Sequence, residues 1–302
     1  MDSRTHEPRS TRGSRRTLIS FCLVIFVAFV VLSASVPAIA QERAAEPEFR
    51  AKLSGEYTPS APPEMMNLPT PRMPDGKPDI SGPWVGGGSN GDIGRQGGFT
   101  GELPLLPWAK ALRDSRDEKD EPYLYCTPMG VPRVNPYPWR FVQSYNAKGP
   151  APIIFVIHEN GDAGAVRQIF MDGRKHPDPS ILIPSWWGHS IGWWEGDTLV
   201  IDTVGYNDKF WFDSRGTPHT EQLHTVERWT RTSFGTMVND FTLDDPGAFS
   251  RPVQLKFTAK VLPPGNELME FVCTENNQYG IAAGIENIYK EKGYGLEAAP
   301  QK

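Results

Sequence analysis

Cysteine is scarce in this chain of 302 residues, which has three: Cys22, Cys126 and Cys273. The sequence contains no CxxC pair, so thiolate zinc sites, iron–sulfur clusters and thioredoxin-like redox chemistry are excluded. A phosphate-binding loop of the GxxxxGK[ST] type is also missing, which disfavours enzymes that depend on such a loop to hold a nucleotide.

Runs of basic residues are missing from the sequence beyond its first 40 residues. Those 40 residues hold five arginines and two acidic residues, so their removal leaves 26 basic and 34 acidic residues, a net charge of −8. Phosphate contacts need clustered Lys and Arg, so we expect no nucleic-acid partner. The hydrophobic content of 38% is enough for a buried core, and 29 Gly and 29 Pro indicate many turns.

The first 40 residues have the pattern of an export signal. Arg15 and Arg16 precede an apolar segment from Leu18 to Leu32, and Ala38-Ile39-Ala40 offers a peptidase site before Gln41. The apolar segment is short for a membrane span, so cleavage is favoured over anchoring. We therefore expect a periplasmic or secreted protein without a stable span after processing. Both the general secretory route and the twin-arginine route stay open.

Two cysteines, Cys126 and Cys273, remain after cleavage. In an oxidising compartment we expect them to form a disulfide, and the alternative is two buried free thiols.

Turn-forming residues divide the mature chain into segments. Residues 41–101 are rich in Pro and Gly and predict an irregular arm. Residues 102–149 predict one short helix, opening at Pro107, and a loop. Residues 150–290 predict an all-β domain, and 291–302 a C-terminal tail.

Eight apolar or alternating stretches in the all-β segment are separated by Gly, Asn, Asp and Pro. They are Pro152–His158, Val166–Met171, Ser190–Trp194, Thr198–Val204, Leu223–Thr232, Met237–Leu243, Val253–Leu262 and Glu267–Cys273. Hairpin spacing without helices predicts an antiparallel meander that closes into a barrel of about eight strands. Gly82-Pro83-Trp84 is similar to the Gly-x-Trp of calycin barrels such as lipocalins, so a calycin-like barrel is expected.

Histidine and tryptophan gather in one part of the sequence. All five histidines of the mature chain lie between His158 and His224, and six of nine tryptophans lie between Trp186 and Trp229. In the hairpin around Glu195-Gly196-Asp197, either of two two-residue turns places His189 and Asp202 on one face, whereas a three-residue turn separates them. Such a pair is suited to general acid–base catalysis, and the alternative is a structural cross-strand hydrogen bond.

The strand after His219 offers two faces, one with His224 and Arg228 and the other with Glu227 and Arg231. We favour His224 and Arg228 facing inward, across the barrel from an inward His189 and Asp202. These four residues form the expected catalytic set. The expected substrate-binding residues are Trp187, Trp193, Trp211, Arg174 and His176. Asp172 and Gly173 also fit a simple turn.

A metal site is the alternative use of these imidazoles. His219, Glu221 and His224, or His176 with Asp172, supply ligands that suit Zn or Fe, but their spacing fits no standard motif. We therefore expect no cofactor.

Several long strings occur in order: MDGRKHP, GHSIGWWEGDTLVIDTVGYND, GTPHTEQLHTVERWTR and EFVCTENN. Together they resemble a family of secreted bacterial proteins over about positions 80–290. The resemblance implies export and a shared scaffold or site that includes Asp172, Arg174, His176, His189, Asp202, His219 and His224. It implies no particular activity.

Three functions are compatible with these features. The first is a cofactor-independent lyase, isomerase or hydrolase that acts on a small apolar or aromatic molecule inside the barrel. The second is a noncatalytic carrier or sensor of such a molecule, since small closed barrels often enclose ligands. The third is a structural envelope protein that uses its arm.

Overall fold

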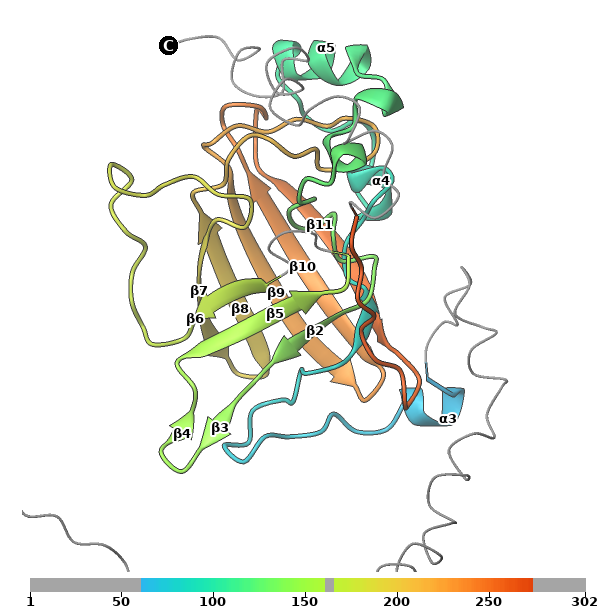
Figure 1. Ribbon diagram of the computed structural model, residues 1–302, viewed down its shortest axis with the longest axis vertical. Helices are drawn as coiled ribbons and strands as arrows, with labels where there is room; N and C mark the ends of the chain where they lie inside the picture. Colours follow the sequence, from blue (N-terminus) through green and yellow to red (C-terminus); the bar gives the residue numbers. More distant parts are fainter. Residues whose placement is uncertain (1–60, 161–165, 274–302) are drawn as a thin grey trace, which may run out of the picture. The chain divides into compact units, whose positions relative to one another are not determined.

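The computed structural model describes residues 61–160 and 166–273. The expected signal peptide, the first part of the arm and the expected tail lie outside these residues. Nine strands of the described part close into one barrel in the order β1-β11-β10-β9-β8-β7-β6-β5-β2 (Figure 1). The prediction of an all-β barrel is confirmed, with one strand more than the eight expected.

Most barrel strands match the predicted stretches within one or two residues. The barrel strands are β1 (Trp84–Gly86), β2 (Trp139–Val142), β5 (Ile153–His158), β6 (Val166–Phe170), β7 (His189–Glu195), β8 (Thr198–Val204), β9 (His224–Ser233), β10 (Thr236–Asp244) and β11 (Val253–Val261). A separate hairpin is formed by β3 (Tyr145–Asn146) and β4 (Gly149–Pro150). The predicted helix is α5 (Pro107–Ser115), which has Pro107 in its first turn.

Two barrel strands come from segments in which no strand was expected. β1 lies in the predicted arm and pairs with both β11 and β2, while β2 lies in the predicted helix-and-loop segment and pairs with β5. Trp84 and Trp139 are partners in the register and are fully buried. The barrel therefore begins well before position 150. Strands of three or four residues are too short for a clear alternation, which is why the sequence pattern does not reveal them.

The predicted meander is wrong at one place, because β6 and β7 pair in parallel. Residues 171–188 connect them, a length that lets the chain return to the starting end of β6 before β7 begins. The predicted strand Glu267–Cys273 does not form. Pro263 and Pro264 follow β11 and end the strand. Both edges of β11 are already paired, one with β10 and the other with β1, so residues 267–273 have no edge of β11 to pair with.

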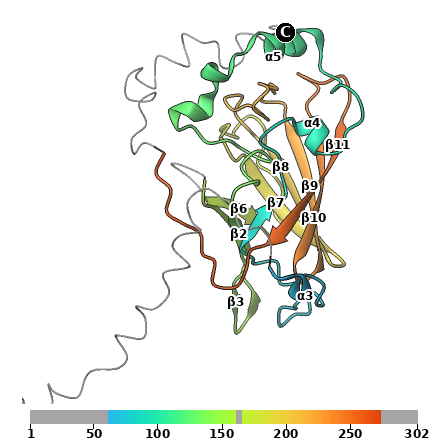
Figure 2. The ribbon, with the colours of Figure 1, turned by 90° about the vertical axis from the view of Figure 1, so that its right-hand side faces the viewer.

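The inward-facing side chains form two apolar clusters with polar residues between them. One cluster includes Phe241, Leu255 and Phe257 and extends to α4 (Ile93–Gln96) and α5. The other includes Trp139, Trp229 and Met237 and lies towards α3 (Pro63–Met66). Figures 1 and 2 show α4 and α5 at one end of the barrel and α3 at the other. No described helix is both long and apolar enough to cross a bilayer.

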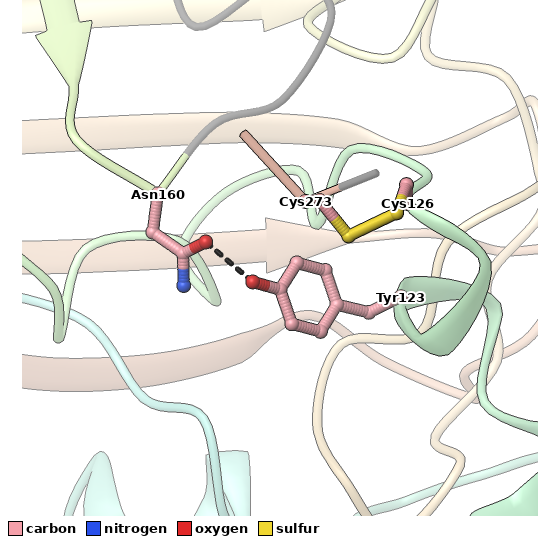
Figure 3. Close-up of a disulfide and its surroundings, with 4 residues drawn as sticks. All are labelled: Tyr123, Cys126, Asn160 and Cys273. Carbon is pink, nitrogen blue, oxygen red and sulfur yellow. Dashed lines mark hydrogen bonds between the residues drawn. A yellow bond between two sulfur atoms is a disulfide. The ribbon is translucent and has the colours of Figure 1, made fainter. Parts of the chain in front are cut away.

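The expected disulfide joins Cys126 to Cys273, with their Cα atoms 5.5 Å apart (Figure 3). It connects the 3₁₀ turn Pro122–Tyr125 to the segment that follows β11. Beside it, the Tyr123 hydroxyl donates a hydrogen bond to Asn160 Oδ1. A cross-link over a separation of 147 residues restricts the unfolded chain and so stabilises the folded one.

Candidate functional site

The hairpin of β7 and β8 has one of the two registers that were expected. Gly196 and Asp197 form the turn, so Asp202 lies opposite Ile191 and diagonal to His189. Both polar residues share a face, as predicted, but that face is the outside of the barrel. Ser190 and Gly192 point inward on β7, and Leu199, Ile201 and Thr203 do so on β8. The larger apolar side chains fill the interior, and alternation then turns His189 and Asp202 outward.

The same alternation corrects the prediction for β9. Thr225, Glu227 and Trp229 are buried on its inner face, whereas His224 and Arg228 lie on the outer one. Trp229 packs against Trp139 with ring centroids 5.0 Å apart, which fixes the orientation of this strand. The expected arrangement of His224 and Arg228 across an internal cavity is therefore wrong.

Outside the barrel, His176, His189, Asp202 and His224 form a hydrogen-bonded group that we call the histidine cluster. His176, from the β6–β7 connection, has its Nε2 2.9 Å from Asp202 Oδ1. The Nε2 of His224 lies 3.0 Å from the same oxygen. The Nδ1 atoms of His176 and His189 are 2.9 Å apart. His176 thus lies between His189 and Asp202, instead of the direct bond between those two residues that was expected.

The network determines which nitrogen carries each proton when the imidazoles are neutral. Ionised Asp202 only accepts, so both His176 and His224 donate from Nε2. His176 then accepts at Nδ1, and His189 must donate from its Nδ1. The two ends of the chain, Nε2 of His189 and Nδ1 of His224, are left as basic nitrogens. The cluster therefore ends in two groups that can take up a proton.

The two terminal imidazoles have pKa values shifted in opposite directions. The hydrogen bond to Asp202 raises the pKa of His224, although partial burial opposes it. Burial lowers the pKa of His189, and the charges of His176 and Arg174 add to that effect. Burial tends to raise the pKa of Asp202, but the hydrogen bonds from His224 and His176 outweigh it and lower the pKa. The shifts of pKa therefore move His224 towards its protonated form, and they move His189 towards its neutral form and Asp202 towards its ionised form.

Arg174, expected to bind substrate, lies next to the cluster. Its guanidinium stands 3.9 Å from the ring centroid of Phe170, and that ring stacks on His189 at 5.2 Å. Arg174 also pairs with Asp172, whose carboxylate accepts the Arg174 backbone N–H across Gly173. Gly173 has a φ of 77°, as the predicted turn requires.

The three tryptophans expected to line one internal cavity lie in three different places. Trp187 stacks flat on His158 at 5.3 Å. Trp211 is buried beside Tyr125. Trp193 points outward with 40% of its surface exposed, and its Nε1 donates to Glu195. Arg228 also pairs with Glu195, at 2.6 Å. Trp193 and Arg228 lie on the outer face, but Arg228 is four residues along β9 from His224, about 13 Å.

The alternative metal site is not assembled in the described part of the chain. His219 is buried, with its ring 4.0 Å from that of Phe210, while Glu221 is exposed. No three His, Cys, Asp or Glu side chains among residues 61–160 and 166–273 come together as a metal-holding group.

Sequence reasoning missed a polar layer inside the barrel. Arg167 of β6 forms a buried ion pair with Glu227 of β9 at 2.6 Å and donates to the hydroxyls of Ser190 and Thr203. Glu227 also accepts from the indole of Trp229. Two features of the sequence pointed to this layer. Arg167 alternates with the inward Ile169 on β6, and the alternative of an inward Glu227 was considered for β9 and not favoured. The partner of Glu227 is Arg167, however, and not Arg231.

No family model matches the chain, and neither does any curated protein or solved structure.

Proposed function

We propose that this protein is an enzyme that transfers protons with the histidine cluster on the outer wall of its barrel. The reaction class that fits is a cofactor-independent lyase, isomerase or hydrolase reaction on a small apolar or aromatic molecule. The observation that carries the proposal is one chain of hydrogen bonds whose ends, His189 and His224, have pKa values shifted apart. Two titratable groups separated in this way are suited to act as base and acid at one pH.

Each residue has a distinct role in this proposal. Unprotonated His189 takes a proton from the substrate at Nε2, and protonated His224 gives a proton from Nδ1 to the departing or negatively charged atom. Asp202 stabilises the positive charge of protonated His224 and orients its imidazole directly. It orients His189 through His176, which contacts both residues. No residue of the cluster has to change its hydrogen-bond partner during the transfer.

Apolar side chains next to the cluster support an apolar or aromatic substrate. Ile191 of β7 and Val226 of β9 flank Asp202 in the register, and Phe170 stacks on His189. Partial burial here lowers the basicity of the neutral His189 imidazole, so it stays unprotonated more readily, and it keeps water away from the reacting atoms.

Export belongs to the same proposal. The disulfide between Cys126 and Cys273 supports an oxidising compartment, because such bonds are rare where thiols are kept reduced. The finer fold assignment, a calycin-like barrel, is proposed on the buried Trp84 that begins β1.

A generic proton-transfer probe tests the function without knowledge of the natural substrate. 5-Nitrobenzisoxazole loses its ring C–H proton to a base, its N–O bond breaks, and the resulting phenolate oxygen is protonated by an acid. We expect the purified protein to accelerate this reaction, with a rate that falls at low pH as His189 is protonated and at high pH as His224 is deprotonated. Catalysis by one positioned group is worth about 10² to 10⁴ in rate.

Variants identify the groups that act. We expect at least a tenfold loss of rate in His189→Ala and Asp202→Asn, and loss of the alkaline decline in His224→Gln. Gln168→Ala, on the exposed outer face of β6, is the matched control and should keep the rate of the original protein. Equal rates in all variants, or a rate no greater than that of free imidazole, would overturn the proposal.

The carrier function is the second candidate. It predicts that a small apolar molecule binds without turnover and that changes in the histidine cluster leave its affinity within a factor of two. A pocket at the end of the barrel favours this alternative.

A further inference from the structure

A pocket of about 280 Å³ lies at the end of the barrel near the β3–β4 hairpin. Residues of three segments line it: the stretch before β1, the residues around β3 and β4, and the ends of β5, β6 and β7. Figure 1 shows the β3–β4 hairpin and the stretch before β1 side by side beyond the end of the barrel. None of the nine residues expected to catalyse or bind lines this pocket.

The lining is mainly apolar. Trp194 and Ile154 come from the inner faces of β7 and β5, and Met171 follows β6. Trp194 and Met171 pack against the apolar cluster that includes Trp139, Trp229 and Met237, and this packing supports their positions. Met73, from the stretch before β1, contributes a second thioether to the lining. Thioethers and an indole make favourable contacts with aromatic rings.

The wall before β1 is fixed to the barrel, so the pocket is formed in advance of binding. Arg72 pairs with Asp197 of the β7–β8 turn through two bonds of 2.6 Å. Lys77 Nζ donates to the carbonyl of Gly196 in the same turn at 3.2 Å. Between these anchors the backbone N–H of Met73 donates to the Lys77 carbonyl at 2.8 Å. A preformed wall lowers the entropic cost of binding.

The charges of the lining do not require a charged guest. Asp172 is paired with Arg174. Asp75 accepts the backbone N–H of Lys77, and the ammonium of Lys77 stands 6.0 Å from the ring centroid of Trp194. The one remaining negative charge and the one positive charge balance. Tyr145 and Ser144 add hydroxyls that can bond to a polar atom of a neutral guest.

The volume limits the size of the guest. A dry cavity of about 150 Å³ holds benzene, so a pocket of about 280 Å³ fits two fused rings. We propose that this pocket binds an uncharged bicyclic aromatic molecule with one hydroxyl or N–H group, of the naphthol or indole class. This site is separate from the histidine cluster, and its occupation does not depend on catalysis there.

Calorimetric titration of the full chain with 2-naphthol tests the proposal. We expect one binding site per chain. Ala151→Phe fills the pocket from a half-exposed position of the lining and should weaken binding at least tenfold. Trp194→Leu removes the aromatic wall and should have a similar effect. Trp193→Leu is the matched control, because this neighbouring side chain points to the opposite face of β7, and its affinity should stay within a factor of two.

Two further measurements make the result decisive. Thermal unfolding of each variant establishes that it folds, and Ala151→Phe keeps the test valid if Trp194→Leu does not fold. Asp202→Asn should bind 2-naphthol as the original protein does, so the pocket is tested separately from the proposed enzyme activity. Absence of binding to the original protein, equal affinity in Ala151→Phe, or an equal loss in Trp193→Leu would overturn the proposal.

Discussion

The inner and outer faces of the barrel both carry ionisable residues, yet these residues differ strongly in their exposure to solvent. Inside, Arg167 and Glu227 leave 2% of each side chain exposed. Outside, the side chains of His176, Asp202 and His224 are 20%, 21% and 38% exposed. Glu227 and His224 therefore experience very different solvation, although they lie three residues apart on β9.

The consequence is a division between structure and chemistry. Arg167 is saturated by a carboxylate and two hydroxyls, and the ion pair that it forms with Glu227 is fully buried. In the histidine cluster, Nε2 of His189 and Nδ1 of His224 take no part in the chain of hydrogen bonds, and the side chains of the cluster are partly exposed, so they can exchange protons with water. Accessible titratable groups can act on another molecule, whereas the inner pair can only support the barrel.

The largest test of this comparison removes one charge from each face. Glu227→Gln leaves Arg167 buried without a counter-charge and should lower the free energy of unfolding by about 3–5 kcal/mol. Glu195→Gln breaks the exposed ion pair of Glu195 and Arg228, whose side chains are 46% and 42% exposed, and should lower the free energy of unfolding far less than Glu227→Gln does. Urea denaturation of both variants measures the difference.

A double variant separates the cost of an unpaired charge from the value of the pair. Arg167→Met with Glu227→Leu removes both charges, so it should be more stable than Glu227→Gln alone. Similar losses in Glu227→Gln and Glu195→Gln would contradict the distinction between the two faces.

The second test uses acid. Burial, with the charge of Arg167 added, lowers the pKa of His158 to about 3. Its pKa in the unfolded chain is near 6.5, so the unfolded state gains a proton first and stability falls as the pH drops below that value. The expected loss from this residue is about 1.4 kcal/mol per pH unit below 6.

Replacement of the buried imidazole shows its contribution. His158→Phe keeps a ring to stack on Trp187 but cannot titrate, so its free energy of unfolding should fall less steeply from pH 6 to pH 5 than that of the original protein. Burial also lowers the pKa of His219 to about 3, and this residue keeps part of the slope in the variant. Parallel curves for the two proteins would show that His158 is not held neutral inside the barrel.

The sequence predicted most of the strands better than it predicted which face of each strand points into the barrel. The turn residues Glu195-Gly196-Asp197 left two two-residue loops and a three-residue loop open, and either two-residue loop places His189 and Asp202 on one side, as the Gly196-Asp197 turn of the structure does. Which side is inward depends on what fills the barrel. Leu199, Ile201 and Trp229 fill it, together with side chains from strands far away in the sequence.

The composition of the cluster was partly predictable for a similar reason. His189, Asp202 and His224 lie on neighbouring strands, so their proximity follows from pairing. His176 joins them from the β6–β7 connection, which has no periodic pattern to place it. The parallel pairing of β6 and β7 also has no local signal, because it depends on where residues 171–188 run.

The smallest effect tests the two ends of the histidine cluster against each other. His224 has its pKa raised in the folded state by Asp202, so its contribution to stability is present below pH 6.5 and is lost as the pH rises through the folded pKa. His189 has its pKa lowered by burial and by His176 and Arg174, so its protonation destabilises the fold as the pH falls below 6.5. We measure the free energy of unfolding of each variant from pH 5 to pH 9. Relative to the original protein, His224→Gln should be most destabilised at the acid end of this range, whereas His189→Gln should be least destabilised there. Both differences in the free energy of unfolding should be below about 1 kcal/mol, because these side chains are partly solvated. In an Asp202→Asn background the pH dependence of the His224→Gln difference should disappear. Differences of the same sign for both histidines would remove the basis for assigning one as acid and the other as base.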